Sequence, residues 1–152
     1  MVSRLLFAWF LMAASVAIHA VGLTAAFRWV KRRPTLIEGR FWHVAWTMIC
    51  IAGWVILLHL LEIAAWAAFY TWREGMPDLA SALYFSAVTY TTTGYGDLLL
   101  PPPWRLVGAV EALTGILMCG WSTGFFFAIV SRMYDTSSPH LSESTVEPAP
   151  PR

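Results

Sequence analysis

Residues 91–97 read Thr-Thr-Thr-Gly-Tyr-Gly-Asp, and the rest of the chain is arranged around this stretch. Gly94 and Gly96 alternate with residues that carry side chains, and glycine adopts positive φ angles without steric cost. A short apolar segment precedes the stretch, and long apolar segments lie on both sides of it. Irregular backbone in a membrane protein is tolerated where it is buried in protein or lines a water-filled cavity. The stretch therefore predicts a loop that lines a pore.

The composition is that of a membrane protein. Of the 152 residues, 58% are hydrophobic and only 12% are charged, whereas an ordinary soluble domain carries about 25% charged residues. The net charge of +1 gives no reason to expect a nucleic-acid partner. Cys50 and Cys119 both fall inside apolar segments, so we interpret them as small hydrophobic residues and not as a disulfide. Membrane lipid is the expected surrounding.

Three apolar segments, residues 5–27, 41–70 and 106–131, each reach the roughly 20 residues that a membrane-spanning helix needs. A further helix is expected to start at a cap formed by Asp78 or Met76 and to end near Tyr90, which is too short to cross a membrane. The predicted fold class is an all-α membrane protein. It has three transmembrane helices, with a re-entrant pore helix and a loop between the last two.

Basic residues gather directly after the first apolar segment, in residues 28–33 and at Arg40. Positively charged loops remain in the cytoplasm. The first segment exceeds the apolar core of a signal peptide, which is about 7–15 residues long, so we expect it to be retained. These observations predict a multi-pass protein of the cell (inner) membrane. Its N-terminus lies outside, and its basic loop 28–40 and its C-terminus lie in the cytoplasm.

The stretch resembles the selectivity filter of the potassium channel family, which runs Thr-Val-Gly-Tyr-Gly followed by Asp. Residues 92–97 match this pattern, with Thr93 in the Val place. Residues 83–89, Leu-Tyr-Phe-Ser-Ala-Val-Thr, resemble the pore helix of the family, and Trp104 begins the next membrane helix. Residues 42–134 as a whole resemble the two-helix pore of small bacterial members.

This resemblance implies a function. In the family, backbone carbonyls from four loops form a ring that replaces the hydration shell of K⁺. The chain is therefore expected to form a homotetrameric potassium channel that conducts passively, and not to be an enzyme. No cofactor is expected, and potassium ions are the permeant partner. The implied ion-binding residues are Thr92, Thr93, Gly94, Tyr95 and Gly96, with K⁺ held at Thr92, Thr93, Gly94 and Tyr95.

Asp97 is expected at the outer mouth of the pore. Many family members pair this Asp with a pore-helix Glu, but the matching position here is Val88. We therefore expect that the bond that holds Asp97 in place, which we call the brace, is absent or is made by a Trp or Tyr side chain.

The predicted organisation has three parts. Residues 1–33 form the N-terminal transmembrane helix and its cytoplasmic basic loop. Residues 34–134 form the pore domain, with outer helix, pore helix, filter and inner helix. Residues 135–152, rich in Ser, Glu and Pro, are predicted to be a disordered tail.

Ionisable residues inside the predicted helices are further candidates, because such residues are costly in a membrane and usually face the protein interior. His59 and Glu62 lie three residues apart, on one helical face. Three interpretations stay open: a structural pair bonded to each other or to a neighbouring helix, a pH-responsive contact that biases gating, and a metal site. His19, in the first segment, is interpreted as a helix-packing histidine.

Two residues of the last segment complete the candidates for gating. Glu111 is expected to pair with Arg105 or with His59. Gly115 lies near the position where the family often has its gating hinge.

Other functions remain as alternatives. A non-selective cation channel of the same fold would show a reversal potential that ignores the K⁺ gradient, and a non-conducting channel subunit would show no current. A more remote alternative is a membrane enzyme or metal carrier that uses His59, Glu62 and Glu111.

Overall fold

The computed structural model describes residues 2–32 and 41–136. The elements are, in order, α1 (Val2–Lys31), α2 (Phe41–Trp72), α3 (Leu79–Tyr90), the short 3₁₀ helix η2 (Pro102–Trp104) and α4 (Arg105–Thr136). No strand occurs in these two ranges. Three helices, α1, α2 and α4, are long and apolar enough to cross a membrane. The predicted fold class of an all-α membrane protein with three transmembrane helices is confirmed.

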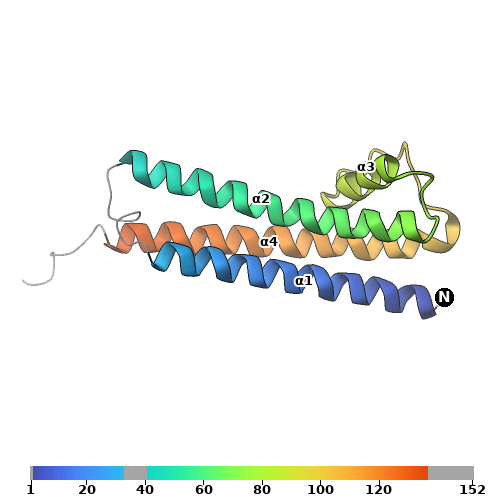
Figure 1. Cartoon of the computed structure of the whole chain (residues 1–152), viewed down its shortest axis with the longest axis horizontal. Helices are drawn as coiled ribbons and strands as arrows, with labels where there is room; N and C mark the ends of the chain where they lie inside the picture. Colours follow the sequence, from blue (N-terminus) through green and yellow to red (C-terminus); the bar gives the residue numbers. More distant parts are fainter. Residues whose placement is uncertain (1, 33–40, 137–152) are drawn as a thin grey trace, which may run out of the picture.

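The three long helices lie lengthwise beside one another, with α2 running opposite to α1 and α4 (Figure 1). Helix α1 contacts both α2 and α4 along the bundle. Helix α3 contacts α2 and α4 at the end of the bundle where the N-terminus lies. Residues 91–97 follow α3 directly, so they lie at this end too.

Two helices extend further than the sequence predicted. Helix α1 continues to Lys31, so Arg28 and Lys31 are helical and the predicted loop 28–40 was wrong for its first residues. Helix α4 continues to Thr136, so Asp135 and Thr136 belong to a helix and not to the predicted tail. Polar residues can continue a helix beyond the hydrocarbon core, and basic residues are stabilised at a helix C-terminus. The predicted linker and the rest of the tail, 33–40 and 137–152, lie outside the described residues.

Helix α3 begins at a well-formed cap. The Asp78 carboxylate accepts hydrogen bonds from the Ser81 backbone N–H and from the Ser81 hydroxyl, both at 2.8 Å. These donors lower the pKa of Asp78 below its usual range. Of the two caps that the sequence left open, Asp78 is the one that forms. The helix has 12 residues and is about 18 Å long, shorter than the roughly 30 Å hydrocarbon core of a bilayer.

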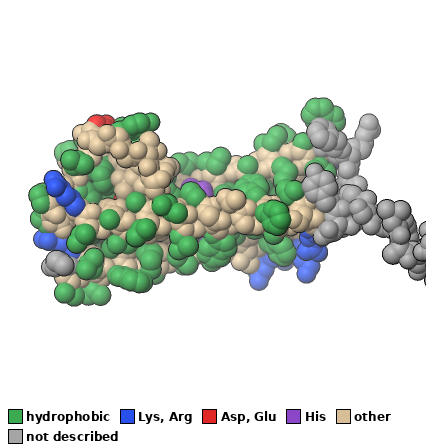
Figure 2. All heavy atoms as spheres, turned by 180° about the vertical axis from the view of Figure 1, so that it is seen from behind, with side chains coloured by type: hydrophobic (Ala, Val, Ile, Leu, Met, Phe, Trp, Pro, Cys, Tyr) green, Lys and Arg blue, Asp and Glu red, His purple; other side chains and the backbone are tan. Residues whose placement is uncertain are grey.

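Arginine–aromatic contacts tie the helix ends together. At the α3 end, the Arg73 guanidinium lies 5.2 Å from the Phe7 ring centre and 5.5 Å from that of Trp104, and Arg4 also stacks on Trp104. At the other end, Arg132 lies 6.0 Å from the Phe27 ring centre. The blue side chains in Figure 2 lie at the two ends, and hydrophobic side chains cover the surface between them. This distribution suits a bundle whose middle is in lipid.

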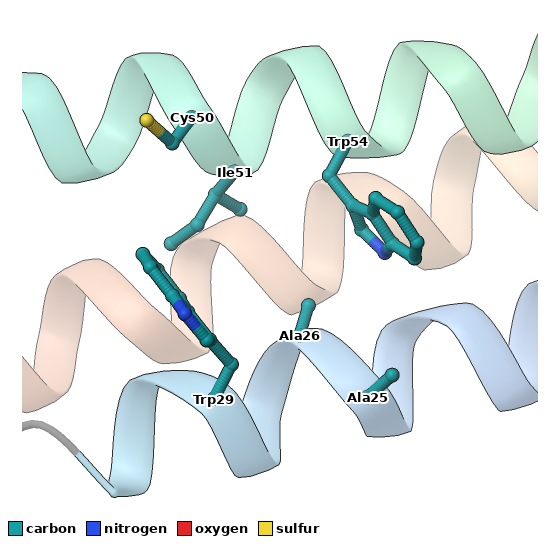
Figure 3. Close-up of a pocket in the computed structure, with 6 residues that line it drawn as sticks. All are labelled: Ala25, Ala26, Trp29, Cys50, Ile51 and Trp54. Carbon is teal, nitrogen blue, oxygen red and sulfur yellow. The ribbon is translucent and has the colours of Figure 1, made fainter.

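An apolar pocket of about 390 Å³ opens between α1 and α2. The Trp29 side chain reaches into it from α1 and the Trp54 side chain from α2 (Figure 3). The Trp54 indole N–H donates to the Gly22 carbonyl at 3.0 Å, which joins the two helices beside the pocket. None of the predicted site residues lines this pocket.

Candidate functional site

Residues 91–97, which the sequence predicts to be a filter and which we call the filter loop, form irregular backbone that is exposed on the single chain. The Tyr95 side chain is 72% exposed. Within residues 2–32 and 41–136, no hydrogen bond ends on the backbone carbonyls of residues 92–96. These oxygens can therefore accept an ion or contact a neighbouring chain.

The φ angle alternates in sign along the filter loop. It is +60° at Thr92, +51° at Gly94 and +78° at Gly96, whereas Thr93 and Tyr95 have negative values. Alternation of left- and right-handed residues turns successive carbonyls toward the same side of the chain, whereas in a β-strand they point to opposite sides. A β-branched residue with positive φ is an outlier that the surrounding structure must hold in place. Positive φ was expected from the sequence at Gly94 and Gly96 but not at Thr92.

The last turn of α3 anchors the start of the filter loop. The Thr92 N–H donates to the Thr89 carbonyl at 2.9 Å, and the Gly94 N–H donates to the Val88 carbonyl at 3.0 Å. The Thr91 hydroxyl donates to the Ala87 carbonyl at 2.7 Å. Thr91, Thr92 and Gly94 thus bind the helix through their N–H groups, whereas the carbonyls of residues 92–96 accept no hydrogen bond within the described residues.

Asp97 is braced by a tyrosine. The Tyr84 hydroxyl of α3 donates to Asp97 Oδ2 at 2.8 Å. This hydrogen bond is the largest cause that raises the pKa of Tyr84. The tyrosine brace that the sequence analysis offered as a substitute for the missing Glu is therefore present.

Five side chains from all four α-helices form a closed hydrogen-bonded ring, which we call the polar ring. His19 Nδ1 lies 2.8 Å from Glu62 Oε1, and His19 Nε2 lies 2.9 Å from Ser122 Oγ. His59 Nε2 lies 3.1 Å from the same Ser122 Oγ, and His59 Nδ1 lies 3.0 Å from the Tyr90 hydroxyl. The Tyr90 hydroxyl closes the ring by donating to Glu62 Oε2. His19 and Glu62 are fully buried.

The proton count of the polar ring follows from its chemistry. Five hydrogen bonds need five protons. With both histidines neutral and Glu62 ionised, the groups carry one proton too few, because the carboxylate brings none. One further proton, shared between His19 and Glu62, completes the ring and leaves it with no net charge. Such a ring can lie inside a membrane-spanning bundle with every polar atom satisfied.

The polar ring corrects part of the sequence analysis. His59 and Glu62 do not bond to each other, but each bonds to side chains of neighbouring helices, which was the other form of the structural interpretation. His19, Tyr90 and Ser122 were missed as partners. A signal was present in the sequence, because His19 and Glu62 are the ionisable residues in the middle of two adjacent predicted spans.

The expected pairing of Glu111 with Arg105 or His59 was wrong. Glu111 is fully buried and accepts hydrogen bonds from the Tyr70 hydroxyl at 2.8 Å and from the Ser86 hydroxyl at 2.6 Å. Arg105 instead donates to the Leu100 carbonyl at 3.3 Å. Arg105 starts α4 at the end of the bundle, whereas Glu111 lies almost two turns further, on the face that packs against α2 and α3.

Gly115 lies where α4 crosses the end of α3. A Cβ atom at this position would lie 2.7 Å from the Tyr90 carbonyl carbon and would overlap the carbonyl oxygen. Only glycine lets the two backbones approach this closely. The gating hinge expected at Gly115 stays a prediction.

Comparison with known proteins places this arrangement in a family. A family model described as "Ion channel" matches residues 49–132, a range that runs from α2 to α4 and contains α3 and the filter loop. The chain belongs to this ion channel family and is a multi-pass membrane protein. No curated protein matches the chain. No solved structure matches it either.

Proposed function

We propose that the chain forms a potassium-selective channel in which K⁺ is bound by the backbone carbonyls of residues 92–96. The observation that carries this proposal is the alternation of φ along the filter loop, together with the absence of hydrogen bonds to the carbonyls of residues 92–96 within the described part of the chain. A row of aligned carbonyls is what replaces the hydration shell of K⁺ in a filter. The C-terminal end of α3, which carries a partial negative charge, lies directly before this row and favours a cation.

A single chain supplies one row of carbonyls, and a ring needs four. The exposed filter loop and the exposed Tyr95 side chain are what a subunit of such a ring presents to its neighbours. The proposed assembly is therefore a homotetramer around one pore, with Asp97 at the outer mouth. Conduction is passive, so the proposal includes no catalytic step and no resident cofactor.

In the proposed orientation the protein spans the inner membrane, with its N-terminus and the filter loop on the outer side. Arg28 and Lys31 lie in the last turn of α1 at the far end of the bundle, Arg32 follows directly, and Arg132 lies near the same end on α4. Basic residues that flank membrane spans favour the cytoplasmic side.

The test is ion flux through the purified protein in liposomes, under a K⁺ gradient and then under a Na⁺ gradient. We expect flux of K⁺ without flux of Na⁺, and loss of K⁺ flux in Gly94→Ala. Gly94 has open space around it but a φ of +51°, so the added methyl group strains the backbone and not the packing. Gly53→Ala is the matched control, because Gly53 is helical and also has open space.

Equal flux of both ions would replace the proposal with a non-selective cation channel. Absence of flux over the whole accessible pH range would favour a non-conducting subunit. Unchanged K⁺ preference in Gly94→Ala would count against the assignment of the filter loop.

A further inference from the structure

Three side chains of the polar ring have the composition of a transition-metal site. His19, His59 and Glu62 each offer one ligand atom, and these atoms all lie within 4.8 Å of one another. Two imidazoles and one carboxylate form a donor set that Zn²⁺ uses with a water molecule as fourth ligand. Ligand atoms in a tetrahedral zinc site lie about 3.3 Å apart, so movements of about 1 Å by the side chains would complete it. We infer that His19, His59 and Glu62 form a site for Zn²⁺ between α1 and α2.

The orientation of the two imidazoles supports this inference. Both rings turn Nε2 toward Ser122 Oγ, at 2.9 and 3.1 Å. Both turn Nδ1 toward the Glu62 carboxylate, His19 directly and His59 through the Tyr90 hydroxyl. Zinc-bound histidines are usually held by a hydrogen bond to the ring nitrogen that does not bind the metal. Ser122 supplies this second contact to both histidines at once.

The site lies closest to the molecular surface at His59. His19 and Glu62 are fully buried, but His59 is only half-buried. One histidine side chain is visible at the molecular surface, beside the lobe that contains α3 (Figure 2). Three protein ligands leave the fourth position for water or for the Tyr90 hydroxyl, whereas closed structural zinc sites use four protein ligands.

The polar ring and the metal would exclude each other. A metal needs the lone pairs of the ligand nitrogens and a deprotonated carboxylate, so binding displaces the proton between His19 and Glu62. Without metal, the hydrogen bonds keep the same side chains oriented. Tyr90, which bonds to both His59 and Glu62, immediately precedes the filter loop. The site therefore adjoins the predicted ion path, but the inference about metal binding does not depend on conduction.

The experiment is a titration of the purified, tag-free full chain with Co²⁺, whose visible absorption reports bound nitrogen and oxygen ligands, followed by displacement with Zn²⁺. We expect one Co²⁺ per chain and full displacement by Zn²⁺. The absorption should be lost in His19→Gln, His59→Gln and Glu62→Gln. Ser122→Ala should weaken binding by about 10- to 100-fold, because it removes the group that orients both imidazoles.

His43→Gln is the matched control, because His43 is an exposed histidine on α2, the helix that also carries His59. It should bind Co²⁺ like the unaltered chain. If the variants of the buried His19 and Glu62 lose their helical circular dichroism, the test of metal binding uses the variant of the half-buried residue, His59→Gln. Absence of Co²⁺ absorption in the unaltered chain, or equal binding in folded His59→Gln, would overturn the inference. Ion flux is not measured in this experiment, so failure of the proposed channel function would leave its result unaffected.

Discussion

Glu111 shows how a single residue can be both costly and stabilising. An isolated carboxylate inside a membrane helix is expensive, yet Glu111 accepts hydrogen bonds from Tyr70 of α2 and Ser86 of α3. It thereby joins three helices at one point. Truncating it would leave two buried hydroxyl groups without their acceptor.

We expect Glu111→Ala to lower the free energy of unfolding by about 1–3 kcal/mol, the cost of leaving buried polar groups unsatisfied. Glu111→Gln keeps the volume and one acceptor oxygen and should lose much less. The measurement is the unfolding transition of the purified protein in detergent, followed by circular dichroism. Equal transitions for Glu111→Ala and the unaltered chain would show that the two hydroxyl bonds contribute nothing.

At the scale of elements, the contact of α3 with α4 determines where the filter loop starts. Gly115 allows α4 to pass against the Tyr90 carbonyl, and a Cβ atom at Gly108 would lie 3.1 Å from the Leu100 side chain. Both glycines lie on the face of α4 that meets the region around α3. Close backbone approach through small residues is a usual mode of helix packing in membranes.

Gly115→Ala should therefore destabilise the protein by about 1–3 kcal/mol, because a methyl group is forced into a filled contact. Gly120→Ala is the control on the same helix. A Cβ atom there meets nothing within 4 Å, and replacing a helical glycine with alanine should add roughly 0.5–1 kcal/mol of stability. Unfolding transitions of the two variants should move in opposite directions. A shift of Gly115→Ala toward higher stability would contradict the packing role of this glycine.

The sequence was sufficient to locate the helices but not to show which side of each helix is buried. Hydropathy located the three spans, and Asp78 was one of the two residues expected to cap α3. Helices that are apolar all round show no periodic stripe to indicate which side is buried. The contact of His19 with Glu62, 43 residues away, depends on how α1 and α2 are rotated. The sequence could therefore mark His19 and Glu62 as candidate partners, but it could not show the closed polar ring or the partners of Glu111.

At the scale of the whole molecule, the proposed channel must share one pore among four chains. Co-reconstitution of unaltered and Gly94→Ala chains in equal amounts tests this. If one defective loop blocks the ring, about one-sixteenth of the K⁺ flux should remain. If each chain conducted alone, about half of the flux should remain, since no ring would be shared. Mixing with Gly53→Ala chains should leave the flux unchanged.

The position of the two buried carboxylates also bears on biosynthesis. In the order of the chain, α1 and α2 precede α3 and α4, and α2 carries Glu62 among apolar residues. Its partner His19 has by then been made, so the α1–α2 hairpin can neutralise this charge on its own. Glu111 enters later, when Tyr70 and Ser86 have both been synthesised. Each acidic side chain thus has a hydrogen-bond partner that is synthesised before it, and the partner of Glu62 comes from α1, which lies outside the matched range 49–132.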